Sequence, residues 1–346
     1  MVKGNSSNYV TEKLCFLMEF LLSQTDFHKQ ETAMNELFTA LDAILKLHGS
    51  ATDHEFGETG MLISSRGAAS CLTGTARTLC YWHSLLVAIE KLQTDRHEPL
   101  RMLYPGSGPF ATLILPLLLG KVTGRIEIHL IEINNQSLAS LANFLNLIQR
   151  PNVKCHIHHC DILEFDSTAL FDLMISEVML SSLQTEGQVA ITYHLSQFLA
   201  PHAILIPEAI NVDLCWSDVT KEFSFVDSHR KPGRGLSLKQ LSPFRKTLTP
   251  LIRLDKNVRQ RYKREGEYLL LQRVEFKKKW PDTGAVICTT NIQFIDDIRL
   301  DEYQNGLTSP IVMADPGCVS GVPLEIKFRM LKMPGYKFVP IDAKSD

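Results

Sequence analysis

The sequence predicts an α/β protein in which a doubly wound domain is followed by a mostly β, barrel-like domain, with helices at the N-terminus. Between Pro99 and Pro207, short apolar runs alternate with helical stretches, which is the signature of βαβ units around a parallel sheet. After Pro207 the helical pattern nearly vanishes, and apolar runs joined by polar turns indicate antiparallel strands. We therefore expect an N-terminal helical segment over residues 1–60, a Rossmann-like domain over 61–208 and a β-rich domain over 209–346.

The N-terminal part is predicted to be helical because its apolar residues recur at helical spacing over residues 8–47. A break near Asp26 would separate two helices, with Asp26 capping the second. Residues 49–60 are polar and contain glycine, which indicates a linker or a mobile lid. A further helix is expected over residues 68–92, and the side chains that we place on its surface are Arg77, Tyr81 and Trp82.

The parallel strands are predicted at residues 101–104, 126–131, 153–157, 173–175 and 203–206. The longest apolar run, residues 111–119, contains Pro116 and is too short for a membrane span, so it predicts a buried helix. The antiparallel strands are predicted at residues 267–276, 285–294 and 324–330.

Composition limits the class of protein and its partners. The chain has 346 residues, of which 45% are hydrophobic, and this suits a well-cored protein of more than one domain. A net charge of −2 gives no general attraction to nucleic acid or to an anionic membrane, and we expect neither as a partner. The 8 cysteines show no CxxC spacing and follow no secretory signal, so we expect a cytoplasmic protein with reduced thiols.

A nucleotide site is predicted where the first parallel strand ends in the Gly106-Ser107-Gly108 turn. Glycines at a strand-to-helix turn let the backbone approach a ligand closely. Glu132 ends the next strand, where it can bridge the two hydroxyls of a ribose. Asp161 and Ile162 follow the third strand, where an acid and adjacent backbone can bind the amino group and ring nitrogen of an adenine. Together these residues predict an adenosine site.

Arg77 helps to distinguish between adenosine cofactors. A nicotinamide cofactor would also use the ribose acid, but it usually has the third glycine of GxGxxG, and here Ala111 stands at that position. Arg77 provides a cation for an amino-acid carboxylate, which favours S-adenosyl-L-methionine.

Four stretches, in the same order along the chain, resemble the protein arginine methyltransferases, a family of class I S-adenosylmethionine-dependent methyltransferases. They are residues 75–81, the glycine turn with Glu132, residues 171–179 and residues 199–208. Glu186 follows Glu177 by nine residues, the spacing of that family's two glutamates. The resemblance implies that Arg77 pairs with the cofactor carboxylate, that Glu177 and Glu186 are catalytic, and that the protein is a homodimer. The dimer arm would be the insert over residues 221–242 or the N-terminal helices.

The chain also departs from that family. Tyr104 stands where the family has an acid, Phe110 replaces its third glycine, and no histidine follows His229, so the barrel's threonine-histidine-tryptophan loop is missing. We therefore expect the methyl acceptor to be an N or O atom of a small guanidino or amino compound. A protein arginine is the alternative acceptor. A non-catalytic binding or assembly protein is a further alternative, which Tyr104 and Phe110 favour.

The two glutamates suit a cationic acceptor. Paired carboxylates can bind a guanidinium or ammonium group, redistribute its charge and accept the departing proton. If the acceptor were an alcohol, one glutamate would suffice as the base.

Two other features have less specific meanings. Residues 155–160, with sequence CHIHHC, contain ligands that zinc prefers, but on a strand they point to opposite faces and no second ligand pair follows at finger-like spacing, so we expect no metal. Basic runs at residues 259–264 and 277–280 could bind RNA phosphates, although solvated strand edges are the commoner explanation.

Overall fold

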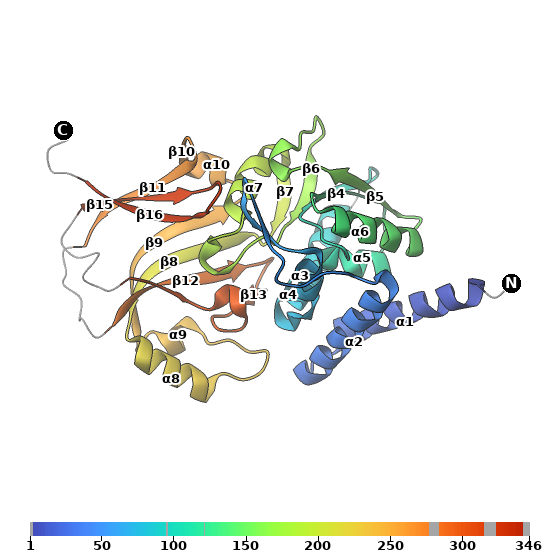
Figure 1. Cartoon of the computed structure of the whole chain (residues 1–346), viewed down its shortest axis with the longest axis horizontal. Helices are drawn as coiled ribbons and strands as arrows, with labels where there is room; N and C mark the ends of the chain where they lie inside the picture. The colour runs from blue at the N-terminus through green and yellow to red at the C-terminus, as the bar shows by residue number, and fades with distance from the viewer. Residues whose placement is uncertain (1–2, 95, 121, 277–283, 315–322, 342–346) are drawn as a thin grey trace.

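The computed structural model describes residues 3–94, 96–120, 122–276, 284–314 and 323–341. An N-terminal helical hairpin, a parallel sheet flanked by helices and a region of antiparallel sheets follow one another along the chain (Figure 1). Among the described helices, none is both long and apolar enough to cross a membrane.

The N-terminal hairpin consists of α1 (Lys3–Ser23) and α2 (Phe27–Leu45). Asp26 caps α2, because its side chain accepts hydrogen bonds from the backbone N–H groups of His28 and Lys29. The predicted break and cap are thus confirmed.

The parallel sheet has five strands in the order β5-β4-β3-β6-β7. All five were predicted, since buried parallel strands produce short apolar runs. β3 pairs with β4 on one side and with β6 on the other. The chain adds β4 and β5 on the first side and β6 and β7 on the second, so the strand order reverses at the neighbouring strands β3 and β6. Ligands bind at the carboxyl ends of the strands at such a switch point. The strands are β3 (Leu100–Pro105), β4 (Ile126–Glu132), β5 (Val153–His159), β6 (Phe171–Ile175) and β7 (Leu199–Ile206).

The helix expected over residues 68–92 is broken. The backbone of Gly74 is not helical, and it separates η1 (Cys71–Thr73) from the long helix α4 (Thr75–Gln93). Tyr81 and Trp82 are fully buried, so their predicted surface position is wrong. Trp82 Nε1 donates to the carbonyl of Thr112 at 2.9 Å, because this face of α4 packs against the turn that follows β3.

The run over residues 111–119 forms η2 and α5, both buried, as predicted. The helices of this part are α3 (Ser65–Ser70), η1 (Cys71–Thr73), α4 (Thr75–Gln93), η2 (Thr112–Ile114), α5 (Leu115–Leu119), α6 (Asn135–Leu147), η3 (Ile162–Glu164), η4 (Ser181–Leu183), α7 (Gln188–Leu195) and η5 (Ser196–Phe198).

Two antiparallel sheets follow β7, one of five strands with β13-β12-β8-β9 and β14 beside β12, the other in the order β10-β11-β15-β16. The three strands predicted here are β11, β12 and β15, and each is confirmed within a residue at either end. The strands are β8 (Ala209–Ser217), β9 (Arg245–Asp255), β10 (Lys263–Glu265), β11 (Tyr268–Glu275), β12 (Ala285–Gln293), β13 (Arg299–Leu300), β14 (Ile311–Ala314), β15 (Pro323–Arg329) and β16 (Gly335–Pro340). The doubly wound α/β fold followed by a mostly β region is therefore the architecture that the sequence predicts.

The insert between β8 and β9 contains helices that the sequence did not reveal. They are α8 (Val219–His229) and α9 (Leu238–Leu241), while α10 (Val258–Arg261) and η6 (Gly306–Thr308) lie further along the chain. Buried Arg245 forms ion pairs with Glu222 of α8 and with Glu302, which fixes the insert to the β region.

Candidate functional site

A cavity of about 180 Å³ opens at the carboxyl ends of β3, β4 and β6. Its wall is formed by the glycine turn, the end of β4, the loop after β6, α7 and residues 53–68. Six of the predicted site residues contribute to this wall: Gly106, Gly108, Glu132, Ile162, Glu177 and Glu186. The other three are Arg77, Ser107 and Asp161, which lie behind it or beside it.

The glycine turn adopts a backbone that requires glycine. Gly106 has φ 66° and Gly108 has φ 63°, both in the left-handed region. A Cβ on Gly106 would lie 2.5 Å from Val178 Cγ1, and one on Gly108 would lie 3.3 Å from the Cβ of Ala68. The two glycines therefore allow a close approach of neighbouring chain segments as well as a tight turn.

Ser107 lies inside this turn and is 1% exposed. Its Oγ is buried and has no hydrogen-bond partner among the residues that the structure describes. Buried polar groups are normally paired, so this hydroxyl is an exception, and it lies between two glycines that line the cavity.

Glu132 connects β4 directly to the glycine turn. Its Oε2 accepts from the backbone N–H of Gly108 at 2.8 Å, while Oε1 accepts from Ile133 at 2.9 Å and Asn134 at 2.8 Å. Burial raises the pKa of this carboxyl, and the three hydrogen bonds oppose that rise. A carboxylate offers about four lone-pair sites, so Glu132 retains capacity for a further donor such as a hydroxyl.

Asp161 and Ile162 have different roles. Asp161 caps η3, because its Oδ1 accepts from the backbone N–H of Leu163 at 2.8 Å. Ile162 lies on the cavity wall. The segment thus places an apolar side chain and adjacent backbone beside the cavity.

Arg77 lies in the interior and not on the helix surface where the sequence predicted it. Its Nη1 donates to Glu177 Oε1 at 3.1 Å, and its Nη2 donates to the carbonyl of Cys71. The two side chains are only 11% and 10% exposed. A guanidinium has five N–H donors, so Arg77 can bind a further acceptor without losing Glu177 or the carbonyl of Cys71.

Glu177 and Glu186 face the same cavity. Burial raises the pKa of both carboxyls, and the charge of Arg77 opposes the rise. For Glu186 the pKa reaches about 8, because burial and the charge of Glu177 act together. Within the described chain the Glu186 carboxyl has no hydrogen-bond or ion-pair partner. The pair therefore combines one carboxylate held by arginine with one carboxyl that is free to meet a ligand.

Gln188 positions the segment that contains Glu177, and it was not predicted as a site residue. Its Oε1 accepts from the backbone N–H of Val178 at 2.9 Å, and its Nε2 donates to Ser176 Oγ at 3.3 Å. Both bonded residues adjoin Glu177. Gln188 is two residues beyond Glu186, so a glutamine at the start of the helix that follows the loop was the available signal.

The loop between the two glutamates has an unusual backbone. Ser182, Leu183 and Thr185 have φ values of 61°, 60° and 75°, although none is glycine. Such positions cost free energy and persist where surrounding contacts fix them. The Ser182 N–H donates to Thr290 Oγ1 of β12 at 2.8 Å, so the β region helps to hold this loop.

Residues 49–60, predicted as a linker or a lid, include most of a small hairpin, β1 (Glu55–Gly57) and β2 (Gly60–Leu62). The N–H of Met61 donates to the carbonyl of Thr185 at 2.8 Å, and the N–H of Lys332 donates to that of Glu58 at 2.7 Å. Thr59 and Met61 line the cavity. The hairpin therefore covers the cavity and contacts the glutamate loop.

The two departures near the glycine turn are accommodated in the core. The hydroxyl of Tyr104 accepts from the backbone N–H of Leu113 at 3.3 Å, and Phe110 packs edge-on against Phe38. Ala111 has φ 49°, so the left-handed conformation that suits glycine occurs here with alanine. The side chains of Tyr104 and Phe110 are both buried and stabilise the turn.

The basic run over residues 259–264 packs partly on the protein itself. Arg259 and Arg264 lie over the ring of Tyr193 at 5.0 and 5.7 Å, and Arg261 forms an ion pair with Asp255 at 2.7 Å. These contacts favour a structural role. The second run, residues 277–280, lies outside the described residues.

No protein-family model matches this sequence, and no curated protein matches it. Among solved structures, the chain is similar to a Trypanosoma brucei PRMT1 enzyme-prozyme heterotetrameric complex with AdoHcy, with a TM-score of 0.41 and 11% identity. The match covers 79% of this chain and 95% of that chain.

Proposed function

We propose that the chain is a class I S-adenosylmethionine-dependent methyltransferase that uses the cavity at the carboxyl end of the parallel sheet. The observation that carries this proposal is the direct hydrogen bond between the turn glycine Gly108 and the buried acid Glu132 at the switch point of the sheet. Glu177 and Glu186 line the same cavity and Arg77 pairs with Glu177, so the groups proposed for the cofactor and for the acceptor adjoin.

The residues present suit the donor. The unpaired Ser107 hydroxyl and the glycine turn would meet the part of the donor nearest the backbone, while Glu132 would accept from its ribose. Ile162 would pack against the adenine, and Arg77 would pair with the amino-acid carboxylate. When bound, the donor supplies a methyl group on a positively charged sulfur.

The glutamates would act on the acceptor. A cationic acceptor beside Glu186 would stabilise the ionised carboxylate and so lower a pKa that now stands at about 8. Glu177, held by Arg77, would orient the acceptor, and the freed Glu186 carboxylate would accept its proton. In-line positioning in a site that excludes water would supply most of the rate.

We propose a small guanidino or amino compound as the acceptor, methylated on N or, with one glutamate as base, on O. The hairpin that covers the cavity favours a small acceptor over a protein segment. A protein arginine is the alternative, and the Glu177 and Glu186 pair supports it equally. A non-catalytic role is supported by Tyr104 and Phe110, whose buried side chains fill positions that the arginine methyltransferases use differently.

Radiolabelled donor identifies the acceptor class. The chain is added with the donor to a cell lysate, and the products are separated into protein and small-molecule fractions. Label in the small-molecule fraction supports the proposal, and label in protein supports the arginine alternative. Label in neither fraction, with donor binding intact, supports the non-catalytic alternative.

We also propose a homodimer in which the insert contributes to the interface. Phe223 of α8 and Leu238 of α9 are 42% and 61% exposed, although both are large and apolar. Light scattering on the purified chain tests this. A monomer at all concentrations would contradict the proposal.

A further inference from the structure

Four polar side chains gather on one face of the parallel sheet, away from the cavity wall. Because strands β4 and β5 are in parallel register, His129 lies opposite His156, and Ile131 lies opposite His158. Side chains alternate along a strand, so Glu127 and His129 of β4 share a face with His156 and His158 of β5. The described chain between β5 and β6 has only η3 in place of a longer helix, and Ile191 and Leu195 of α7 belong to the same apolar cluster as Ile131.

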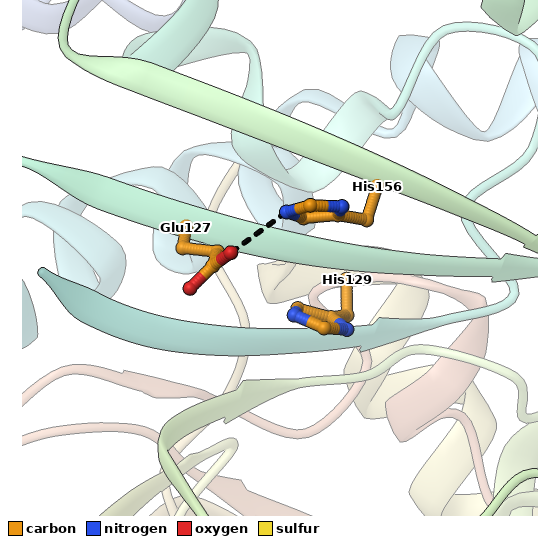
Figure 2. Close-up of side chains that lie close together, drawn as sticks. All are labelled: Glu127, His129 and His156. Carbon is orange, nitrogen blue, oxygen red and sulfur yellow. Dashed lines mark hydrogen bonds and ion pairs between the residues drawn. The ribbon is translucent and has the colours of Figure 1, made fainter. Parts of the chain in front are cut away.

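Glu127, His129 and His156 form a compact group (Figure 2). One ligand atom from each lies within 4.8 Å of the other two. His156 Nε2 lies 2.7 Å from Glu127 Oε1, and this contact holds the imidazole and the carboxylate together. Figure 2 shows the three side chains on one side of two neighbouring strands.

His158 supports the group from one side. Its Nε2 lies 3.0 Å from Nδ1 of His129, and the two rings stack with an interplanar angle of 13°. That contact leaves Nε2 of His129 available. Imidazoles that bind metals usually bond through their second nitrogen to a neighbour, which fixes the ring orientation.

Aromatic side chains limit the group on another side. Phe171 packs against His129 and Phe165 packs against His158, with ring centroids 5.0 and 5.2 Å apart. An apolar wall restricts solvent access to a polar cluster and steadies its side chains. Glu127 and His156 remain 24% and 32% exposed, so an ion can enter from solvent.

Two imidazoles and a carboxylate are ligands that Zn²⁺ and similar divalent transition metals accept. In a tetrahedral site with bonds of about 2.1 Å, ligand atoms lie about 3.4 Å apart, so the present spacing needs only small side-chain rotations. Arg101 and Lys154 lie 3.7 and 3.8 Å from the Glu127 carboxylate, but their side chains are 48% and 72% exposed. Such exposed, loosely paired cations compete weakly for the carboxylate.

We propose that Glu127, His129 and His156 bind a divalent transition-metal ion of the Zn²⁺ class, with His158 orienting His129. The ion links β4 to edge strand β5. Residues 155–160 alone did not indicate this site, because Glu127 comes from a strand 29 residues before His156. The proposal is independent of the methyl-transfer reaction.

Calorimetry on the chelator-treated full chain tests the site with Zn²⁺ as the probe and Mg²⁺ as the comparison. We expect one Zn²⁺ per chain, no response to Mg²⁺, and affinity reduced by about tenfold or more in His156→Ala and in Glu127→Gln. The matched control is His159→Ala, on the opposite face of the same strand, which should bind as the parent does. Zn²⁺ should also raise the melting temperature of the parent and of the control, but not of the two ligand variants.

Co²⁺ absorption identifies the ligand atoms, since a sulfur-to-cobalt charge-transfer band would assign the ion to cysteine. The proposal is overturned by that band, by the absence of saturable Zn²⁺ binding, or by equal affinity in the parent and both ligand variants. It is also overturned if His159→Ala weakens binding as much as His156→Ala does. Circular dichroism shows whether each variant is folded. If His156→Ala does not fold, Glu127→Gln still tests the site independently.

Discussion

The Glu186 carboxyl has a pKa raised from 4.5 to about 8, first by burial and then by the charge of Glu177. Between these two values the folded state binds more protons than the unfolded state, so the free energy of unfolding falls as pH rises. The side chain in Glu186→Gln cannot ionise, so this variant should lack that contribution to the pH dependence of the free energy of unfolding. The melting temperature of the parent should therefore fall more steeply from pH 5 to pH 9 than that of Glu186→Gln. Parallel curves would show that Glu186 is ionised throughout.

Glu177→Gln tests the division of roles between donor and acceptor. The change keeps the shape of the side chain and a partner for Arg77 at 3.1 Å, but removes the charge that orients a cationic acceptor. Methyl transfer should fall by roughly a hundredfold or more, while calorimetric binding of the donor is retained. If donor binding is lost as well, Glu177 belongs to the donor site.

Among individual residues, the sequence predicted those that line the cavity better than those, such as Gln188, that hold the lining residues in place. Five residues were predicted from their positions relative to the strands and to one another along the chain, and all five lie on the cavity wall: Gly106, Gly108, Glu132, Glu177 and Glu186. The hydrogen bonds of Gln188 depend on how the chain returns to the same point in space, which spacing does not encode. Tyr81 and Trp82 were misplaced because apolar residues occur on more than one face of α4.

At the scale of elements, the strand-to-helix turn after β3 depends on Gly106. Gly106→Ala would strain a left-handed backbone by about 1–2 kcal/mol and would also place a Cβ against Val178. Gly266 provides the matched control, since its φ is 60° and no atom lies within 4 Å of the position that a Cβ would take. Gly106→Ala should weaken donor binding by about tenfold or more, and Gly266→Ala should leave it unchanged. Equal donor affinity in both variants would show that the conformation of the turn does not affect donor binding.

The sequence predicted strands more accurately than helix boundaries. Short apolar runs mark buried parallel strands, so all five strands of the parallel sheet were found. The break at Gly74 interrupts a pattern that remains helical on both sides, and only the backbone conformation reveals it. Helix α8 was missed although it carries local signals, since Asp218 caps its N-terminus and Glu222 and Val226 are buried four residues apart on one face.

At the scale of the whole molecule, Arg245 joins the insert to the β region. Its side chain is 6% exposed and lies between two carboxylates, Glu222 and Glu302, that are 1% and 3% exposed. Arg245→Met would leave both carboxylates buried without a cation, so we expect a loss of about 3–5 kcal/mol in the free energy of unfolding. Chemical denaturation measures this.

Arg273→Met is the control for that measurement. Arg273 also pairs with a glutamate, but its side chain is 72% exposed. Its loss should change the free energy of unfolding by about 0–1 kcal/mol. A similar small change in Arg245→Met would mean that the buried ion pairs do not stabilise the insert.

The order and register of strands lay beyond the sequence. Apolar runs identify strands without stating which of them are neighbours, and the chain gives no local signal that β3 lies between β4 and β6. For the same reason the group of Glu127, His129 and His156 could not be found along the chain, since register brings it together. Side-chain sites formed across strands depend on this long-range information.

Calorimetry with S-adenosylmethionine and its demethylated product tests directly whether the cavity beside Gly106, Gly108 and Glu132 binds this donor. We predict that both compounds bind one per chain, compete with each other, and are not displaced by a nicotinamide dinucleotide. Absence of binding by either compound at about millimolar concentration, equivalent to a binding free energy weaker than about −4 kcal/mol, would contradict the claim.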